Sequence, residues 1–135
     1  MDIKNYKWIN YRGKRFDNND WISGDLVCYA GQTYIHNKSV DKDEAVPVFV
    51  PVQPETVSRW STFYTESDTK KAIYEGDILK CHFREGDITC VVEWFADKAT
   101  FMVRRPKDTR PYAHLYLALN SEIIGNIWDN SDLVK

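Results

Sequence analysis

Apolar and polar residues alternate most regularly in the C-terminal half of the chain. In residues 77–83, every second position from Leu79 onward is apolar, and residues 88–95 follow the same rule from Ile88 onward. A period of two is that of a β-strand, whose successive side chains point to opposite faces of a sheet. The polar stretch 84–87 between the two segments has the composition of a turn. The pattern therefore predicts an antiparallel hairpin.

The alternation also predicts which residues face one another. A four-residue turn at 84–87 places Cys81 opposite Cys90, and a second turn at 96–99 places Val92 opposite Val103. A slip of one residue would move every side chain to the other face, so the apolar pattern specifies which face is buried. The predicted buried face consists of Leu79, Cys81, Phe83, Ile88, Cys90, Val92, Trp94, Phe101 and Val103.

Two further apolar patterns follow these strands. Leu115, Leu117 and Leu119 alternate with other residues, and residues 123–128 are largely apolar. Five short strands with small turns and one large loop are typical of a small barrel, which avoids exposed edges by curling on itself. We predict an SH3-like antiparallel barrel over residues 72–135.

The N-terminal half is patterned less regularly. Residues 14–16 and 21–29 read as paired strands around the Asn- and Asp-rich turn 17–20. Strands are also predicted at 33–36 and 57–64. In residues 45–52 valines alternate but prolines remove backbone donors, which indicates an edge strand or an extended arm that adds a strand to a partner. The polar stretch 66–71 is interpreted as the loop between two subdomains.

These patterns together give one fold prediction. The chain of 135 residues suits a single domain, 1–135, of the mainly β class, with a β-rich α+β fold left open. An irregular β subdomain is predicted over residues 1–65, ahead of the barrel. The aromatic content of 14% supports strands, because aromatic side chains suit pleated, half-buried surfaces.

Charge and composition narrow the classes of partner and location. Eighteen Lys and Arg residues against 20 Asp and Glu give a net charge of −2, which is not typical of a protein that coats nucleic acid or binds anionic lipid. No apolar run has the length of a membrane-spanning helix, so no membrane contact is expected. The first residues lack the apolar core of a secretory signal. A cytoplasmic location is expected.

Few groups of residues in the sequence suggest a catalytic or metal-binding site. Cys81 and Cys90 are expected to be reduced core residues, because no His or carboxylate shares their face to complete a metal site. The acids around Gly76 are interpreted as a tight bend before a strand. We therefore predict no catalytic residue, no metal and no cofactor. An enzyme stays open as an alternative, and would need a pocket that collects Glu75, Asp77, His82 or His114.

The segment 104–112 is the strongest candidate for a binding site. Its four cations and one aromatic residue are predicted to contact nucleic acid or a protein partner: Arg104, Arg105, Lys107, Arg110 and Tyr112. A second basic segment lies at the N-terminus and contains Lys4, Lys7, Arg12, Lys14 and Arg15. If the two segments converge, they would form a surface that follows phosphates. The alternative is a solvated polar loop.

Several blocks of the chain resemble the YopX family of phage and prophage proteins. The blocks occur in the family's order and span nearly the whole chain: YRGKRFDNNDWISGDL at 11–26, PETV at 54–57, IYEGDIL at 73–79, VVEW at 91–94 and IIGNIWDNSDL at 123–133. The chain departs from the family pattern in three places. Asn19 replaces a glycine, residues 57–63 differ, and residues 65–71 lack the usual turn.

The resemblance implies a function in general terms only. It implies a phage- or prophage-encoded β-rich protein with an SH3-like C-terminal part that associates with itself, in a bacterial host cell. It supplies no catalytic residues. We expect an accessory protein without enzymatic activity that acts through contacts with a phage or host protein or with nucleic acid. A direct DNA- or RNA-binding protein that uses the basic loop is the first alternative.

Overall fold

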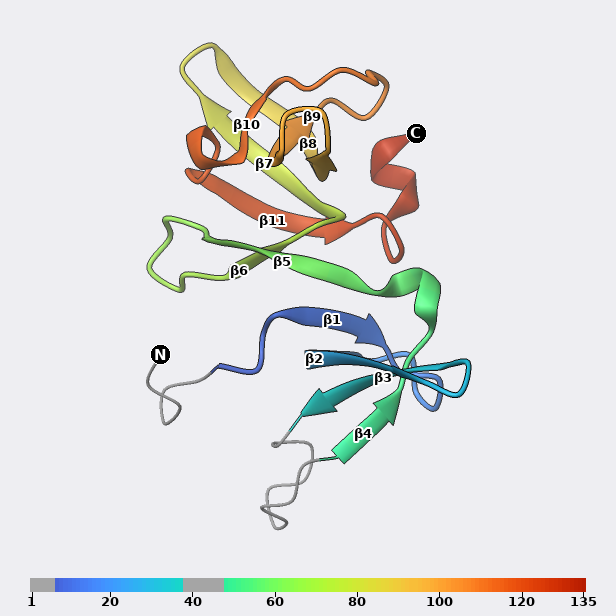
Figure 1. Cartoon of the computed structure of the whole chain (residues 1–135). Coiled ribbons are helices and arrows are strands. Elements are labelled where there is room, and N and C mark those ends of the chain that lie inside the picture. Colours follow the sequence, from blue (N-terminus) through green and yellow to red (C-terminus); the bar gives the residue numbers. More distant parts are fainter. Residues whose placement is uncertain (1–6, 38–47) are drawn as a thin grey trace. The chain divides into compact units, whose positions relative to one another are not determined.

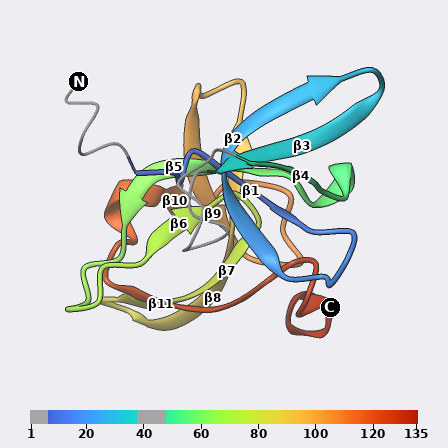
Figure 2. The ribbon, with the colours of Figure 1, turned by 90° about the horizontal axis from the view of Figure 1, so that it is seen from below.

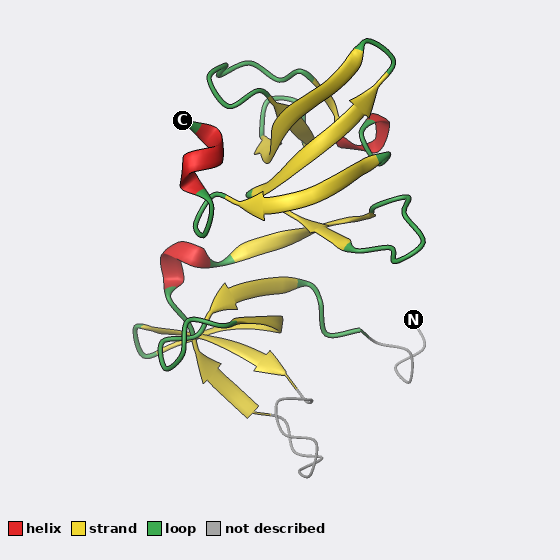
Figure 3. Ribbon diagram, turned by 180° about the vertical axis from the view of Figure 1, so that it is seen from behind, coloured by secondary structure: helices red, strands yellow, loops and turns green. Residues whose placement is uncertain are grey.

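The structure is a computed structural model that describes residues 7–37 and 48–135, and it is mainly β, as predicted (Figures 1 and 3). The described strands are β1 (Tyr11–Lys14), β2 (Trp21–Tyr29), β3 (Gln32–Asn37), β4 (Val48–Pro51), β5 (Ser58–Tyr64), β6 (Ala72–Tyr74), β7 (Asp77–Phe83), β8 (Gly86–Phe95), β9 (Thr100–Arg104), β10 (Ala113–His114) and β11 (Ser121–Asn126). Short 3₁₀ helices are η2 (Pro54–Thr56), η3 (Leu115–Leu117) and η4 (Ser131–Val134). Within these residues, no helix has the length and apolar character that crossing a membrane requires.

The chain divides into two compact units, which are described separately. Unit 1 is Met1–Trp60 and unit 2 is Ser61–Lys135. In unit 1, the strands follow the order β4-β3-β2-β1, and the first residues of β5 pair with β1. A core of Ile22, Ile35, Val50 and Val52 lies against this sheet.

Both hairpins predicted for unit 1 are present, but the first strand is Tyr11–Lys14 rather than residues 14–16. Lys14 pairs with Trp21 across the Asn- and Asp-rich turn. Tyr29 pairs with Gln32, and the two residues between them, Ala30 and Gly31, have positive φ values of 50° and 79°. Positive φ at both central positions is the geometry that matches the right-handed twist of a tight hairpin. Figure 2 shows the long β2–β3 hairpin that results.

The predicted valine-rich edge strand is confirmed in its described part. Among the described strands, β4 pairs with β3 alone and ends at Pro51, so the missing proline donor lies at a sheet edge, where it costs least. Residues 45–47 of the predicted segment lie outside the described residues.

Unit 2 contains an antiparallel sheet of five strands in the order β10-β9-β8-β7-β11 (Figure 1). Its remaining strand, β6, pairs with β5. The five-stranded sheet is not closed, because β10 and β11 are its two edges and do not pair with each other. The prediction of an antiparallel sheet is confirmed, whereas its closure into a barrel is not.

The register predicted for the first hairpin of unit 2 is wrong by two residues. Cys81 pairs with Ile88, and Leu79 rather than Cys81 pairs with Cys90. The turn has two residues instead of four, because Gly86, at a φ of 132°, already pairs with Phe83. A shift of two residues leaves each side chain on the same face, since the period of a strand is two. The prediction of the buried face therefore survives the error in register.

The second register and most of the predicted core are confirmed. Val92 pairs with Val103 and Trp94 with Phe101. One apolar cluster contains nearly all the predicted residues: Leu79, Cys81, Phe83, Ile88, Cys90, Val92, Phe101 and Val103. Trp94 is the exception, because it is half-buried outside this cluster and contacts Phe101 edge-on at 5.0 Å between ring centres.

The predicted strand of alternating leucines is wrong. Residues Leu115–Leu117 form the 3₁₀ helix η3, in which Ala118 N donates to Leu115 O at 2.8 Å. A turn of three residues breaks the strand alternation, so Leu115 is fully buried while Leu117 is 59% exposed. The last strand, β11, begins and ends two residues earlier than predicted. It ends at Asn126, whose side chain accepts hydrogen bonds from the backbone of the next turn.

The bend predicted at Gly76 is confirmed. Gly76 has a φ of 89°, and a Cβ atom there would lie 2.6 Å from the Trp128 ring. Of the two acids beside Gly76, Asp77 has a structural place in this turn. Asp77 is 1% exposed, and its carboxylate accepts the backbone N–H of Tyr74 at 2.8 Å.

Candidate functional site

All five residues of the predicted binding site lie in the basic loop, defined here as residues 104–112. The loop leaves strand β9 and returns to β10, where Tyr112 N donates to Val103 O at 2.8 Å. The structure thus brings the predicted residues onto one loop of unit 2. Their partners decide how much of their charge faces solvent.

The guanidinium of Arg104 forms bonds that hold the basic loop in place. Its Nε lies 2.5 Å from the Glu93 carboxylate, and its Nη1 donates to the carbonyl oxygen of Pro106 at 3.1 Å. The side chain is 24% exposed. A guanidinium with a carboxylate and a loop carbonyl as partners positions the chain and has little capacity left for a phosphate.

Arg110 is also paired within the loop. Its Nε and Nη2 lie 3.3 and 3.4 Å from the two carboxylate oxygens of Asp108. Hydrogen bonds from the Arg110 backbone and side chain lower the pKa of Asp108, so this acid stays charged at neutral pH. The Arg110 side chain is 84% exposed, however, and such a surface pair is weak.

Tyr112 contacts Arg105 on its ring face and Phe83 at a tilt of 55° between the rings. The Arg105 guanidinium lies over the Tyr112 ring at 4.9 Å, and the rings of Tyr112 and Phe83 are 5.3 Å apart. Lys107, the remaining cation of the loop, has no ionic partner among the described residues and lines a cavity of about 330 Å³ together with Glu93 and Asp108. The basic loop is therefore a mixed-charge surface with a stacked aromatic residue.

The N-terminal basic segment belongs to unit 1. Arg12 and Lys14 lie over the ring of Trp21, at 4.7 and 5.9 Å. Arg15 pairs with Asp17 at 2.7 Å. These cations contact aromatic or acidic neighbours within their own unit, and Lys4 lies outside the described residues.

His82 links three strands of unit 2 through two carboxylates. Its Nδ1 lies 2.7 Å from Asp87 on β8, and its Nε2 lies 3.4 Å from Glu122 on β11. The hydrogen bond to Asp87, with a smaller contribution from Glu122, raises the pKa of His82. Asp77 begins the same strand five residues earlier, roughly 16 Å away at the usual rise of a strand. One small pocket does not collect both.

The two cysteines of unit 2 are core residues. Cys81 and Cys90 are fully buried, and a hydrogen bond between the thiols together with burial raises the pKa of Cys81. The same hydrogen bond lowers the pKa of Cys90, against the effect of its burial. A buried thiol with a raised pKa, as at Cys81, is a poor nucleophile and a poor metal ligand. Within the part of the chain that the structure describes, no three His, Cys, Asp or Glu side chains are placed to hold a metal ion.

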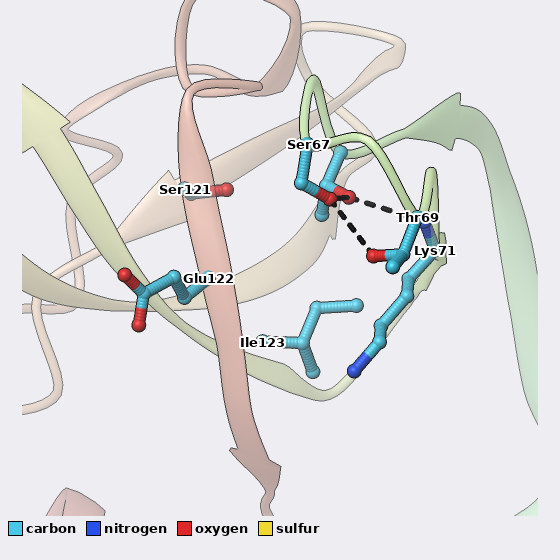
Figure 4. Close-up of a pocket in the computed structure, with 7 residues that line it drawn as sticks. Ser67, Thr69, Lys71, Ser121, Glu122 and Ile123 are labelled. Atoms are coloured by element: carbon cyan, nitrogen blue, oxygen red, sulfur yellow. Dashed lines mark hydrogen bonds between the residues drawn. The ribbon is translucent and has the colours of Figure 1, made fainter.

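A second polar site, which the sequence did not predict, lies between the loop after β5 and strand β11 (Figure 4). We call it the hydroxyl pocket. It has a volume of about 250 Å³ and is lined by Thr65, Ser67, Thr69, Lys71, Ser121, Glu122 and Ile123. The loop is attached beside β11 by a 2.9 Å backbone hydrogen bond from Glu66 N to Leu119 O.

The hydroxyl groups of the loop form a chain. Thr65 Oγ1 accepts the backbone N–H of Lys71 at 3.1 Å and lies 2.9 Å from Ser67 Oγ, which lies 3.2 Å from Thr69 Oγ1. Across the pocket, the Ser121 hydroxyl points at this loop in Figure 4. Ser121 is 5% exposed, and its Oγ has no hydrogen-bond partner in the described structure.

A signal for this pocket exists in the sequence but is easily missed. Thr65, Ser67, Thr69 and Lys71 occupy every second position of a segment that reads simply as a polar loop. Ser121 is distant in sequence, and only the pairing of β11 with β7 brings it to the loop. The pocket therefore depends on tertiary structure.

Comparison with protein families places most of the chain in one family model. The family model described as YopX protein matches residues 10–135. None of the curated proteins searched matches the chain.

Proposed function

The chain belongs to the YopX family, and from this premise we propose that it is a non-enzymatic accessory protein that binds a protein partner through the basic loop. The observation that carries the proposal is the stack of Arg105 on Tyr112. The proposed location is the cytoplasm of a bacterial host, and the proposed origin is a phage or prophage.

The charges of the loop favour a protein partner over a nucleic acid. Glu93 holds Arg104, and Asp108 lies beside the exposed Arg110, so the loop has less net positive charge for phosphates than its cations suggest. Arg and Tyr are enriched at the positions that contribute most to protein–protein binding. Tyr112 is 36% exposed, and Tyr116 and Leu117 nearby are 55% and 59% exposed. This composition fits the centre of a protein interface.

The surroundings of the histidines support the non-enzymatic part of the proposal. His82 lies between two carboxylates, and His114 stacks on Tyr116 at 5.4 Å. His36 stacks on Phe49 at 4.5 Å. None of these rings bonds to a hydroxyl or thiol in the described residues, as activation of a nucleophile would need.

The strand order of unit 2 supports the finer proposal of an SH3-like fold. Strands β7 to β10 follow one another, the 3₁₀ helix η3 comes next, and β11 then pairs with the first strand of the series. An SH3-like barrel has this order of elements, with sheet edges that approach without full pairing. We propose that unit 2 is such an open barrel.

Changing Tyr112 tests the proposed interface. We expect wild-type protein to capture a specific protein from phage-infected or prophage-induced cells, with and without nuclease treatment. Tyr112→Ala and Arg105→Ala should each weaken binding of the purified partner about tenfold or more, because truncation of interface anchors typically costs this much. Binding should be measured by calorimetry.

A matched control distinguishes an effect specific to the basic loop from the general effect of removing an exposed tyrosine. Tyr29 is 75% exposed on strand β2 of unit 1, so Tyr29→Ala removes the same side chain elsewhere. This variant should bind the partner as the wild type does. Equal binding by the wild type and the Tyr112→Ala variant would contradict the proposal.

Single-stranded nucleic acid is the second candidate ligand, favoured by Lys107 and by the exposed ring of Tyr112. Bases stack on aromatic side chains, and cations follow the backbone. This candidate predicts oligonucleotide binding that falls steeply with salt and is lost when Arg104, Arg105, Lys107 and Arg110 are changed together. Absence of binding to any oligonucleotide at low salt would exclude it.

We also propose that the protein associates with itself through strand β4. Among the described strands, β4 pairs with β3 alone, and Phe49 on it is 57% exposed. An exposed edge strand pairs readily with a second chain. Light scattering should give the mass of an oligomer for the wild type and a smaller mass for Phe49→Lys. An unchanged mass would argue against this edge.

A further inference from the structure

The hydroxyl pocket offers several hydrogen-bond donors, because four of its lining residues are Ser or Thr and one is Lys. Thr65, Ser67 and Thr69 have three hydroxyl hydrogens between them, and the two hydrogen bonds of their chain use two. One hydrogen therefore stays available for a ligand, whichever direction the chain takes. The Thr65 oxygen is already an acceptor for the backbone N–H of Lys71.

Two further donors come from other parts of the wall. The Ser121 hydroxyl is buried, points into the pocket and has no partner in the described structure. The ammonium group of Lys71 lies beside Ile123 in Figure 4, and no described carboxylate pairs with it. A buried hydroxyl without a partner costs free energy, so its presence at a cavity calls for an explanation.

The one acid that borders the pocket does not point into it. Figure 4 shows the Glu122 carboxylate on the side of β11 away from the loop, because neighbouring residues of a strand alternate. There it lies 3.4 Å from the His82 ring. The pocket thus has one positive charge, free donors and no opposing negative charge from its own lining.

We propose that the hydroxyl pocket binds a small oxyanion, with a phosphoryl group as the ligand class. Phosphoryl oxygens accept several hydrogen bonds at once, which matches the free hydroxyl of the loop, the Ser121 hydroxyl and the Lys71 ammonium. The volume of about 250 Å³ fits a phosphate with a small attached group and is below the usual range for a drug-sized ligand. This site is separate from the proposed protein interface.

Titration with inorganic phosphate at constant ionic strength tests the proposal. We expect saturable binding by calorimetry, with a dissociation constant on the order of 1 mM. Acetate and glycerol at the same concentrations should bind more weakly, because they offer fewer acceptor oxygens or no charge. Tighter binding of acetate would overturn the assignment of a phosphoryl group.

Two variants and one matched control identify the site. Lys71→Met should weaken phosphate binding about tenfold or more, since it removes a charge-assisted donor. Ser121→Ala should weaken binding roughly fivefold while leaving the melting temperature of the free protein unchanged or raised. A purely structural Ser121 would lower that temperature instead. Lys70→Met makes the same charge change at the exposed neighbour, which does not line the pocket.

The outcomes divide clearly. Binding that is lost in the Lys71 and Ser121 variants and kept in the Lys70 variant supports the site. Absence of saturable binding overturns it, as does an equal loss in all three variants, which would show general attraction of the anion to surface charge. The loop variants Arg105→Ala and Tyr112→Ala should bind phosphate normally.

Discussion

The basic loop and the hydroxyl pocket differ in how their polar groups are used. The loop contains four cations, yet Arg104 pairs with Glu93, Arg110 pairs with Asp108 and Arg105 covers Tyr112. The pocket contains one cation and several hydroxyls, and its donors have no acidic partner within it. A count of charges in the sequence favours the loop, whereas the buried hydroxyl without a partner, Ser121, lies at the pocket.

This difference teaches that a polar segment has to be judged by its partners. A cation paired with a carboxylate and a loop carbonyl holds the protein's own loop in place. A hydroxyl that is buried without a hydrogen-bond partner raises the free energy of the folded protein. A ligand that forms a hydrogen bond to it removes this cost. The following predictions test each side of this contrast, beginning with the largest effect.

The largest effect is expected where the chain leaves the basic loop for strand β11. Leu115 is fully buried in the core of unit 2, so Leu115→Ala should lower the free energy of unfolding by about 2–5 kcal/mol. Leu117→Ala is the matched control, because that side chain is 59% exposed, and should change it by less than about 0.5 kcal/mol. Urea denaturation measures both. Equal losses would mean that the leucines alternate as in a strand after all.

A pair of buried serines tests the cost of the free donor in the pocket. Ser61 is 2% exposed and donates to Ile73 O at 2.6 Å, so Ser61→Ala should cost about 1–2 kcal/mol. Ser121 is buried to a similar degree without a partner, so Ser121→Ala should be neutral or stabilise by up to about 1 kcal/mol. Thermal unfolding compares them. A loss at Ser121 as large as at Ser61 would mean that its hydroxyl is already satisfied.

Removing the acidic partner of Arg104 should raise the affinity of the basic loop for nucleic acid, as the cations in its sequence suggest. Glu93→Gln removes the carboxylate 2.5 Å from Arg104 Nε. Affinity for a single-stranded oligonucleotide at low salt should rise, and its dependence on salt should steepen by about 0.7 per added phosphate contact. Fluorescence anisotropy over a salt series gives this slope. Glu85→Gln, an exposed acid in the β7–β8 turn, is the control and should leave the slope unchanged.

The smallest expected effect is a change of stability with pH. It arises from His82, which contacts strand β11, one wall of the hydroxyl pocket. The pKa of His82 is raised in the folded state, so its contribution to stability is fully present below the ordinary value of 6.5 and is lost as pH rises through the raised value. His82→Gln should abolish this loss between about pH 6 and 8. The ring of His114 stacks on Tyr116 instead, so the His114→Gln variant should retain the loss of stability with rising pH. Melting temperatures across the pH range decide the matter, and identical profiles for the wild type and His82→Gln would contradict the assignment.

The strands were predictable because their patterns are local. Alternation over a few residues fixed the buried face of β7 and β8, and an error of two residues in the turn did not disturb it. The alternation of Leu115 and Leu117 was misleading, because a 3₁₀ turn buries one of the two and exposes the other. Periodicity alone does not distinguish three residues of strand from one tight turn.

The sites were less predictable because they depend on distant residues. The residues of the basic loop could be named from composition, but the pairing of Arg104 with Glu93 follows from the register of β8 and β9. The hydroxyl pocket requires the loop after β5 to meet Ser121, more than fifty positions later in the sequence. No local pattern reports that contact. The family membership supplies no site residues.

The most direct test of the contrast is an NMR titration of the wild-type protein with inorganic phosphate. Backbone amide shifts report which residues meet the anion, independently of any variant. We predict saturable shifts at residues 65–71 and 121–123 and none of comparable size at residues 104–112. Shifts centred on the basic loop would contradict the account, because they would show that its cations are available and that the donors of the hydroxyl pocket are not.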